Sequence, residues 1–412
     1  MNPERYILEW KEEIFSDAIN VNPTRVLKKE KKAKFVSMTD LHPFNKIIQG
    51  YGFRDFSGGS KFINNDTLMA RITPCLENGK TAFVDILDKG ETGFGSTEFI
   101  VLSAKEGKTT PHFVYYLATS PLIRPTVIKS MTGTSGRQRA DSDIFNQISI
   151  NLPSIPEQEA IVNILKSLDD KIELNQQMNN TLEQIGQAFF KRWFVDFEFP
   201  DEEGEPYRSS GGEMVDSELG EIPKGWKVGR LEGIIVNFDS KRVPLSSRER
   251  ALRKGKYPYY GATSIMDYID DYLFDGIYLL MAEDGSVIDE SEHPVLQYIW
   301  GKFWVNNHAH VLQGKEGIPI EYVYLLLKQT NVKHLVTGAV QPKINQNNMN
   351  NLNVVIPPED IISNFSKLVG CIFEKNRLNS DEITILSQIR DSLLPKLMSG
   401  ELRVNVPESV SP

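Results

Sequence analysis

The fold is decided by two matching stretches, EQEAIVNILKSLDDKIELNQQMNNTLEQIGQAFFKRW at residues 157–193 and IISNFSKLVGCIFEKNRLNSDEITILSQIRDSLLPKL at residues 361–397. In both, apolar residues recur at spacings of mostly three and four, the pattern of a helix with one apolar stripe. The stretches match at a constant shift of 204, so that Leu174-Asn175 returns as Leu378-Asn379 and Gln184-Ile185 returns as Gln388-Ile389. We therefore expect two long helices that belong to a repeated unit.

The matched stripes predict that the two helices pack on each other as a coiled coil. The alternative is that each helix packs separately on its own globular domain, but that arrangement would not need the same register in both copies. Both stripes are polar at their centres, at Asn175 and Asn179 and at Asn376 and Asn379, and a polar residue in a seam fixes register and partner. The expected interface residues are Leu165, Leu168, Ile172, Leu182, Ile185 and Phe189 on the first helix, and Val369, Ile372, Leu386, Ile389 and Leu393 on the second.

Each helix is expected to run for about 38 residues, roughly 57 Å at 1.5 Å per residue. Such a pair would hold two globular domains apart at a fixed distance. Pro395 lies near the end of the second helix. Because proline lacks a backbone N–H, we expect it to break or kink that helix before Met398.

The repeat extends beyond the helices, with a shift that drifts. Residues 113–117 (FVYYL) return as residues 322–326 (YVYLL), and Leu68-Met69-Ala70 returns as Leu280-Met281-Ala282. A drifting shift indicates insertions and deletions in the loops of a common fold. Residues 81–87 and 277–281 have strand composition bounded by turn residues. The predicted fold is α+β: two mixed α/β globular domains separated by two long antiparallel coiled-coil helices, a tandem repeat with pseudo-twofold symmetry.

The repeat divides the chain into four expected segments. Residues 1–152 form the first globular domain, and residues 153–218 form a central helical region with an acidic connector. Residues 219–356 form the second globular domain, and residues 357–412 form a C-terminal helical region.

The net charge of −9 is unevenly distributed along the chain. Residues 153–221 hold 16 acidic and 5 basic side chains, whereas residues 1–152 and 222–356 carry net charges of +3 and +1. The two globular parts are therefore compatible with phosphate contact. We expect the acidic stretch 196–221 to be a solvated connection that lies away from nucleic acid.

Other features of the composition concern the cellular location. A run of about 18 apolar residues would be needed for a membrane span, and residues 1–10 are too charged for a secretory signal. Cys75 and Cys371 are the two cysteines; we expect both to be buried free thiols in a reducing cytoplasm.

Four motifs, in their order along the chain, carry a family resemblance. The segment 388–404 (QIRDSLLPKLMSGELRV) closely resembles the C-terminal conserved region of the specificity subunits of type I restriction-modification enzymes. Residues 152–158 (LPSIPEQ) and 187–197 (QAFFKRWFVDF) are similar to the start and end of the family's central conserved region, and residues 219–226 (LGEIPKGW) to the entry of its second recognition domain. The second copy departs from the pattern at residues 357–360 (PPED), which weakens the repeat locally.

The resemblance implies a function for each part. Each globular part would be a target-recognition domain that reads a few base pairs of double-stranded DNA. The helices would form the spacer and dock two methyltransferase subunits, which carry S-adenosylmethionine and methylate adenine N6. A motor-nuclease subunit would complete the complex. The chain itself would hold no cofactor and would not be an enzyme.

The best candidate for base readout is the loop at residues 132–139 (TGTSGRQR), with residues 337–343 (TGAVQPK) as its counterpart in the second copy. Glycines let the backbone approach closely, hydroxyl groups suit phosphate oxygens, and arginine and glutamine side chains match base edges. The alternative is a solvated surface loop, but the same loop type recurs at the same place in both copies. The candidate DNA contacts are Thr132, Gly133, Ser135, Arg137, Gln138, Arg139, Gln341 and Lys343.

Weaker candidates for DNA contact are basic clusters elsewhere, which are more often solvated faces. They are Lys61, Arg71 and Lys80 in the first domain, and Arg253, Lys254, Lys256 and Tyr259 in the second. The run at residues 28–32 (KKEKK) is expected to be a solvated loop.

Aromatic residues are dense at the end of the first helix. Such density can be core packing alone, but an aromatic excess at the end of an element often marks a protein interface. The residues expected to dock a partner are Phe190, Trp193, Phe194 and Phe197.

Several patterns that could indicate chemistry are incomplete. Gly79-Lys80-Thr81 lacks the first glycine of a P-loop, because Pro74 stands at that position. His308 and His310 have no metal-ligand set at suitable spacing and are expected to be strand or surface histidines. Two other readings stay open: a diverged nuclease or methyltransferase fusion, which cofactor binding by the chain would reveal, and an assembly or inhibitor protein without base readout.

Overall fold

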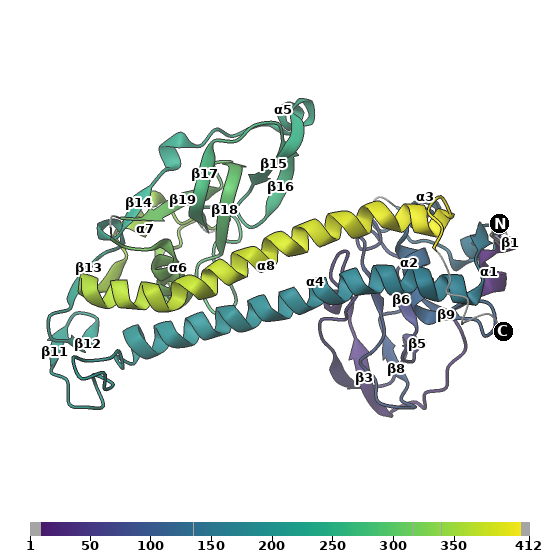
Figure 1. Ribbon diagram of the computed structural model, residues 1–412, viewed down its shortest axis with the longest axis horizontal. Helices are drawn as coiled ribbons and strands as arrows, with labels where there is room; N and C mark the ends of the chain where they lie inside the picture. The colour runs from purple at the N-terminus through teal and green to yellow at the C-terminus, as the bar shows by residue number, and fades with distance from the viewer. Residues whose placement is uncertain (1–9, 135, 316, 339, 405–412) are drawn as a thin grey trace, which may run out of the picture. The chain divides into compact units, whose positions relative to one another are not determined.

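The computed structural model describes residues 10–134, 136–315, 317–338 and 340–404. The chain divides into two compact units. Unit 1 contains the residues up to Leu174 and those from Glu382 onward, and unit 2 contains residues 175–381. Two long helices, α4 (Ile155–Phe190) and α8 (Glu359–Ser399), each contribute to both units as continuous helices (Figure 1).

Unit 1 contains two four-stranded sheets, with strand orders β2-β9-β6-β7 and β4-β3-β8-β5, and an antiparallel pair, β1 with β10. Its strands are β1 Lys11–Ile14, β2 Ile19–Val21, β3 Lys32–Val36, β4 Gly52–Asp55, β5 Ser60–Phe62, β6 Thr67–Ala70, β7 Thr81–Phe83, β8 Gly93–Gly95, β9 Phe99–Ala104 and β10 Ser149–Leu152. Its short helices are α1 Phe15–Ala18, α2 Pro111–Thr119 and α3 Arg124–Lys129. The apolar face of α2 packs with β6, β9 and α4 in the main core of the unit.

Unit 2 is built around a six-stranded sheet of order β14-β19-β17-β18-β15-β16, with the pairs β13-β20 and β11-β12. Its strands are β11 Met214–Ser217, β12 Gly220–Pro223, β13 Lys227–Arg230, β14 Ile235–Asn237, β15 Lys254–Tyr260, β16 Ile265–Ile269, β17 Phe274–Ala282, β18 Leu296–Val305, β19 Ala309–Gly314 and β20 Asn353–Ile356. Its short helices are α5 Ser247–Leu252, α6 Ile320–Lys328 and α7 Gln346–Asn350.

The two units repeat one framework, as the sequence predicts. In unit 1, Leu68 on β6 pairs with Val101 on β9, and in unit 2, Leu280 on β17 pairs with Val311 on β19, both in antiparallel register. The pair β1-β10, which precedes α4, has its counterpart in β13-β20, which precedes α8. The predicted strand at residues 81–87 is shorter than expected, since β7 ends at Phe83.

The long helices are antiparallel partners in each unit. In unit 1, Arg390 lies 2.9 Å from Asp169 and Glu382 lies 3.3 Å from Lys171, so residue numbers rise on one helix as they fall on the other. In unit 2, the Asn179 amide donates to Ser380 Oγ at 2.9 Å. This confirms the coiled coil.

The shift of 204 relates the buried positions of the two helices. The equivalent pairs that are buried in both copies include Ile161 with Phe365, Leu165 with Val369, and Asn175 with Asn379. The predicted central asparagines lie in the seam, where Asn379 donates to Asn179 Oδ1 at 3.0 Å. Ile185 and Ile389 were expected there but are 39% and 42% exposed, and the neighbouring positions 186 and 390 face the protein instead.

Two other local expectations are wrong, namely a break of the second helix at Pro395 and the burial of both cysteines. α8 continues through Pro395 to Ser399, because Leu394, Leu397 and Met398 are buried in the core of unit 1 and hold the last turn in place. Cys371 is exposed on α8, and Cys75 is half-buried. No helix among the described residues is long and apolar enough to cross a membrane.

Burial of His112 on α2 predicts a pH dependence of stability. The pKa of His112 is lowered to about 4 from an ordinary value of 6.5, first by burial and then by repulsion from Lys46 and Lys166. As the pH falls below 6.5, His112 binds a proton in the unfolded chain but stays neutral in the folded chain. The free energy of unfolding therefore decreases between pH 6.5 and about 4. We expect the melting temperature to fall less between pH 7 and pH 5 in His112→Gln than in the unsubstituted chain. Equal falls in both would contradict the assignment.

Candidate nucleic-acid interface

The loop at residues 132–139 in unit 1 is closed by backbone hydrogen bonds. Thr132 and Arg139 exchange N–H···O bonds of 3.0 and 2.9 Å. Two further bonds join this region to the segment that follows β6. Thr73 N–H donates to Gln138 O at 3.0 Å, and Ala140 N–H donates to Arg71 O at 2.8 Å. The loop is therefore fixed against the end of β6.

The loop at residues 337–343 in unit 2 has the same frame. Thr337 and Lys343 exchange N–H···O bonds of 2.8 Å. Gly285 N–H donates to Pro342 O at 3.0 Å, and Ile344 N–H donates to Glu283 O at 2.9 Å, against the end of β17. Arg139 thus corresponds to Lys343, and Arg71 corresponds to Glu283.

One more backbone bond extends the correspondence to the next strand. Arg71 N–H donates to Glu98 O at 2.9 Å, and Glu283 N–H donates to His308 O at the same distance. Glu98 therefore corresponds to His308. The two units hold one backbone frame but carry different charged side chains on it.

In unit 1, Arg139 is held by Glu98. Its Nε lies 2.9 Å from Glu98 Oε1, and its Nη2 lies 2.7 Å from the same oxygen. The hydrogen bonds with Glu98 raise the pKa of Arg139 further above its ordinary value. The Arg139 side chain remains 46% exposed. In the rest of the loop, Thr132, Gly133 and Arg137 are exposed and Gln138 is half-buried, while Ser135 lies outside the described residues.

In unit 2, Lys343 is 46% exposed and pairs with Glu283, which is part of a mostly buried ion-pair network. The Nζ of Lys343 lies 3.0 Å from Glu283 Oε1, and Arg242 Nη1 lies 2.7 Å from Glu283 Oε2. Burial opposes ionisation of Glu283, but the hydrogen bonds from Arg242 and Lys343 lower its pKa. Gln341 and Val340 are exposed, with Val340 99% exposed.

His310 adds a second charge pair to this network. Its Nδ1 lies 2.6 Å from Asp239 Oδ2, and its Nε2 lies 2.8 Å from the carbonyl oxygen of Ile344. These two contacts, one to each ring nitrogen, fix the orientation of the buried ring. Burial works against ionisation of Asp239, but the hydrogen bond and charge of His310 lower its pKa.

The same residues could be taken for a metal site. Ligand atoms of Asp239, Glu283 and His310 lie within 4.8 Å of one another. However, Arg242 and Lys343 already pair with the carboxylates, and both His310 nitrogens already lie within hydrogen-bond distance of protein oxygen atoms. The cluster is therefore built as an ion-pair support beneath the 337–343 loop. The half-buried His308 lies nearby in the sequence, and its Nδ1 lies 2.8 Å from Asp284 Oδ2.

The weaker candidates in unit 1 separate into two places. Lys61 and Arg71 line one cleft, beside Arg25, Ser60 and Thr97. The Arg71 Nε is buried and has no hydrogen-bond partner among the described residues, so an anion in the cleft could satisfy it. Lys80 instead donates to Met38 O at 2.8 Å.

The weaker candidates in unit 2 are mostly paired. Arg253 lies 2.9 Å from Asp270, and Lys254 lies 2.5 Å from Asp267, while Lys256 is exposed. Tyr259 was expected to contact DNA but is 1% exposed, and its hydroxyl accepts a hydrogen bond from Leu245 N–H at 2.9 Å. Burial in the sheet removes it from the surface.

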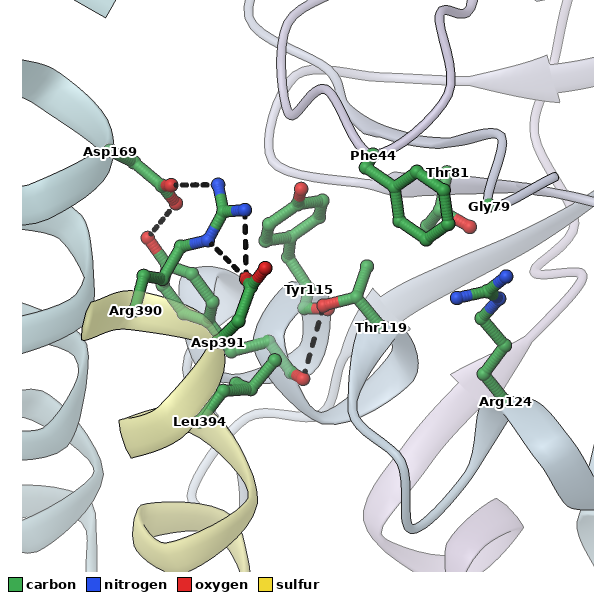
Figure 2. A pocket seen from close by; sticks show the side chains of 11 residues that line it. Phe44, Gly79, Thr81, Tyr115, Thr119, Arg124, Asp169, Arg390, Asp391 and Leu394 are labelled. Carbon is green, nitrogen blue, oxygen red and sulfur yellow. Dashed lines mark hydrogen bonds and ion pairs between the residues drawn. The ribbon is translucent and has the colours of Figure 1, made fainter. Parts of the chain in front are cut away.

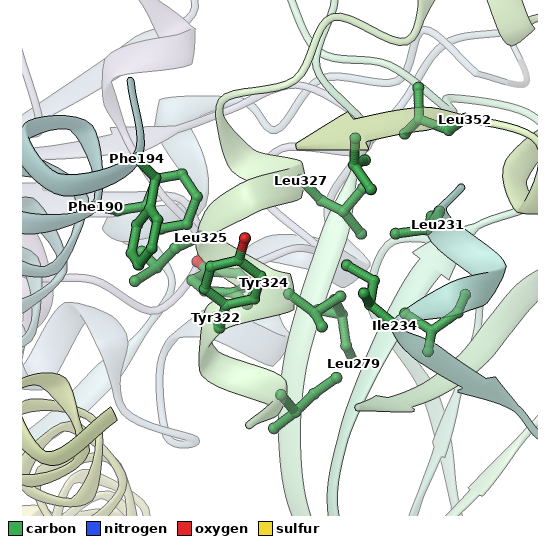
Figure 3. Close-up of a cluster of buried hydrophobic side chains, with 14 of the residues drawn as sticks. Phe190, Phe194, Leu231, Ile234, Leu279, Tyr322, Tyr324, Leu325, Leu327 and Leu352 are labelled. Carbon is green, nitrogen blue, oxygen red and sulfur yellow. The ribbon is translucent and has the colours of Figure 1, made fainter. Parts of the chain in front are cut away.

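The aromatic residues expected to dock a partner lie in the core of unit 2. Phe190, Trp193, Phe194 and Phe197 are only 1–9% exposed. Phe194 lies 5.1 Å from Tyr322 and 4.7 Å from Phe365 between ring centroids, and Figure 3 shows Phe190 and Phe194 beside Tyr322. Their burial is explained by packing within the chain. The acidic connector is partly structured, because Phe199 stacks on Trp226 at 5.1 Å.

A pocket in unit 1 contains a charge cluster that the sequence analysis missed. Figure 2 shows Asp169 on α4, Arg390 and Asp391 on α8, and Tyr115 and Thr119 on α2 around it. The Tyr116 hydroxyl donates to Asp169 at 2.6 Å, and Arg390 Nη1 lies 2.9 Å from Asp169. Burial, followed by the charge of Asp169, raises the pKa of Tyr116. The cluster ties α2 to both long helices.

The geometry defines a class of protein: a tandem repeat of two related domains, each with a loop that carries basic residues on a common backbone frame. The family model for the type I restriction modification DNA specificity domain matches residues 13–184 and 223–380. The chain belongs to this family.

Similar proteins include two curated specificity subunits and one solved structure. The MjaIX subunit of Methanocaldococcus jannaschii is 29% identical, over 73% of this chain and 71% of its own length. The HindI subunit of Haemophilus influenzae is 28% identical, over 85% and 89%. The crystal structure of a type I S subunit from M. genitalium has a TM-score of 0.55 at 16% identity, covering 97% of this chain and 98% of that one. This last likeness supports the fold.

Proposed function

We propose that the chain reads a bipartite, asymmetric DNA target as the specificity subunit of a type I restriction-modification enzyme. Each unit reads one half-site with its loop, at residues 132–139 or 337–343. The observation that carries the proposal is the repeated backbone frame with exchanged side chains: Arg71, Glu98 and Arg139 in unit 1 stand where Glu283, His308 and Lys343 stand in unit 2. One scaffold with two sets of side chains is what two unlike half-sites require.

Charge reversal in the two loops tests this function. Arg137→Glu and Lys343→Glu are expected to act on separate half-sites, because the residues lie in different units. Where a side chain contacts phosphate, binding weakens for all sequences and the salt dependence decreases. Where it contacts a base, preference relaxes at one position. Binding is measured by competition on duplexes altered in one half-site at a time. Lys367→Glu, an exposed position on α8 that is not among the candidate DNA contacts, serves as a control. Unchanged binding in both loop variants would contradict the proposal.

The proposal includes partners. Two methyltransferase subunits dock on the helices, and a motor-nuclease subunit joins them. S-adenosylmethionine binds to the methyltransferase, and this chain is non-catalytic. Support comes from exposed apolar residues that repeat at the shift of 204: Leu174 and Leu378 are 50% and 57% exposed, and Ile185 and Ile389 are 39% and 42% exposed. Exposed apolar residues that recur in both copies suit two identical partners.

Polar substitution at one copy of this surface should remove one partner. Leu174→Gln with Ile389→Gln changes unit 1, and Leu378→Gln with Ile185→Gln is the matched change in unit 2. For either pair we expect the complex to shift from two methyltransferase subunits per chain to one, measured by native mass spectrometry. The melting temperature of the chain alone is the control, since exposed residues contribute little to its stability. Retention of both subunits in both variants would refute the docking surface.

A further inference from the structure

Hydrogen bonds hold both the backbone and the side chain of Arg139, although the side chain is 46% exposed. Its backbone is bonded to Thr132 and forms a bridge with Ile72. Its guanidinium lies in a fork of three contacts with Glu98, at 2.9, 3.0 and 2.7 Å. Glu98 is itself held, because its N–H donates to Ser96 Oγ and its carbonyl accepts from Arg71 N–H. The side chain is therefore oriented before any ligand arrives.

The contacts with Glu98 use only one edge of the Arg139 guanidinium. Glu98 occupies the edge formed by Nε and Nη2. Among the described residues, the single further contact of Nη1 is with Arg137 O at 3.5 Å, so the edge formed by Nη1 and Nη2 still offers one N–H from each nitrogen. Two parallel N–H groups match the O6 and N7 acceptors of guanine in the major groove.

Unit 2 has different side chains at the positions equivalent to Arg139, Glu98 and Arg71. Lys343 replaces Arg139, and an ammonium group is a point charge without a planar fork. Its carboxylate partner, Glu283, comes from the position of Arg71, whereas His308 occupies the position of Glu98 and pairs with Asp284. The bidentate readout that Arg139 can provide is therefore absent from the equivalent position in unit 2.

We propose that Arg139 reads a guanine in the half-site of unit 1, and that Glu98 is the positioning residue that presents the free edge of Arg139 to that base. This inference rests on the proposed function. Glu98 acts by fixing one orientation of a long side chain, so that less side-chain entropy is lost when DNA binds. Because Glu98 takes the other edge, it does not compete with the guanine.

The test compares Glu98→Gln, Arg139→Lys and the double variant. Each full chain is co-expressed with its methyltransferase subunit, and methylation is sequenced on a plasmid library randomised at the target. Arg139→Lys keeps the positive charge but removes the two parallel N–H donors of the guanidinium. The preference for guanine at one position of one half-site should therefore fall by about 5- to 150-fold. Glu98→Gln should lower preference at the same position several-fold. The double variant should equal Arg139→Lys alone, because Glu98 acts only through Arg139.

Matched controls separate positioning from folding. Glu283→Gln, which removes the partner of Lys343, should change the other half-site or overall affinity and leave this guanine preference intact. Glu98→Asp keeps the carboxylate and should restore part of the preference. The melting temperature of Glu98→Gln should stay close to that of the unsubstituted chain, because the ion pair is exposed and such pairs contribute little.

Three outcomes would overturn the inference. Unchanged preference in Glu98→Gln together with relaxed preference in Arg139→Lys would remove Glu98 from the readout while leaving the proposed function intact. An equal loss at every sequence with a lower melting temperature would make Glu98 merely structural. Relaxation at a base other than guanine would refute the assigned base. Failure of the proposed function itself looks different, since the unsubstituted chain would then show no base preference in either half-site.

Discussion

Replacing Phe194 by alanine is expected to lower the free energy of unfolding of the isolated chain by about 3–5 kcal/mol, the range for removing a buried aromatic ring. Phe194 is 8% exposed and lies 5.1 Å from Tyr322, 4.7 Å from Phe365 and 5.9 Å from Trp226 between ring centroids. Its ring therefore joins the end of α4, the start of α8 and the recognition domain of unit 2. Urea unfolding followed by tryptophan fluorescence measures the loss.

The neighbouring Val195 provides the control for this experiment. Val195 is 47% exposed, so Val195→Ala should change the free energy of unfolding by no more than about 0.5 kcal/mol. If Phe194→Ala left the isolated chain as stable as before and weakened only its binding to a methyltransferase, the aromatic cluster would be a docking surface, as the sequence alone suggested.

Inserting four residues into the first helix, within residues 157–193, is expected to change the preferred spacer and to leave both half-sites unchanged. α4 and α8 each continue from one unit into the other without a break. Four helical residues add about 6 Å of rise, which is close to two base-pair steps of 3.4 Å. The measurement is the methylation of targets that differ only in spacer length.

A second insertion controls for general disturbance of the chain. Four residues placed in the exposed turn between β11 and β12, at Glu218-Leu219, lie outside the long helices and should leave spacer preference as it was. If the helix insertion altered both half-sites while the spacer stayed constant, the helices would not set the spacing.

The repeat and the helix seam could be predicted because their signals are local. Apolar spacing of three and four residues marks a buried helix face whatever the partner is, and Leu165 and Val369 are buried. The same spacing includes Ile185 and Ile389, which are exposed. The periodicity of apolar residues predicts an apolar stripe on each helix. It does not show which residues at the edge of that stripe the partner helix leaves exposed.

The charge clusters and the burial of the aromatic residues could not be predicted, because they depend on contacts between residues that are distant in the sequence. Glu98 and Arg139 are 41 residues apart, and Asp169 and Arg390 are 221 residues apart. The aromatic cluster reads as an interface until Trp226 and Tyr322 are seen to cover it. The sequence already aligns Arg71 with Glu283, because they follow the matching segments 68–70 and 280–282, but the backbone bonds that join these two positions to Glu98 and His308 could not be predicted.

The most direct test of the central claim is to co-express the chain with its methyltransferase subunit and to map adenine methylation on plasmid DNA by single-molecule sequencing. The account predicts a split, asymmetric motif whose methylation needs both proteins. Methylation that proceeds without this chain, or that falls on a continuous palindrome, would contradict its role as the reader of DNA sequence.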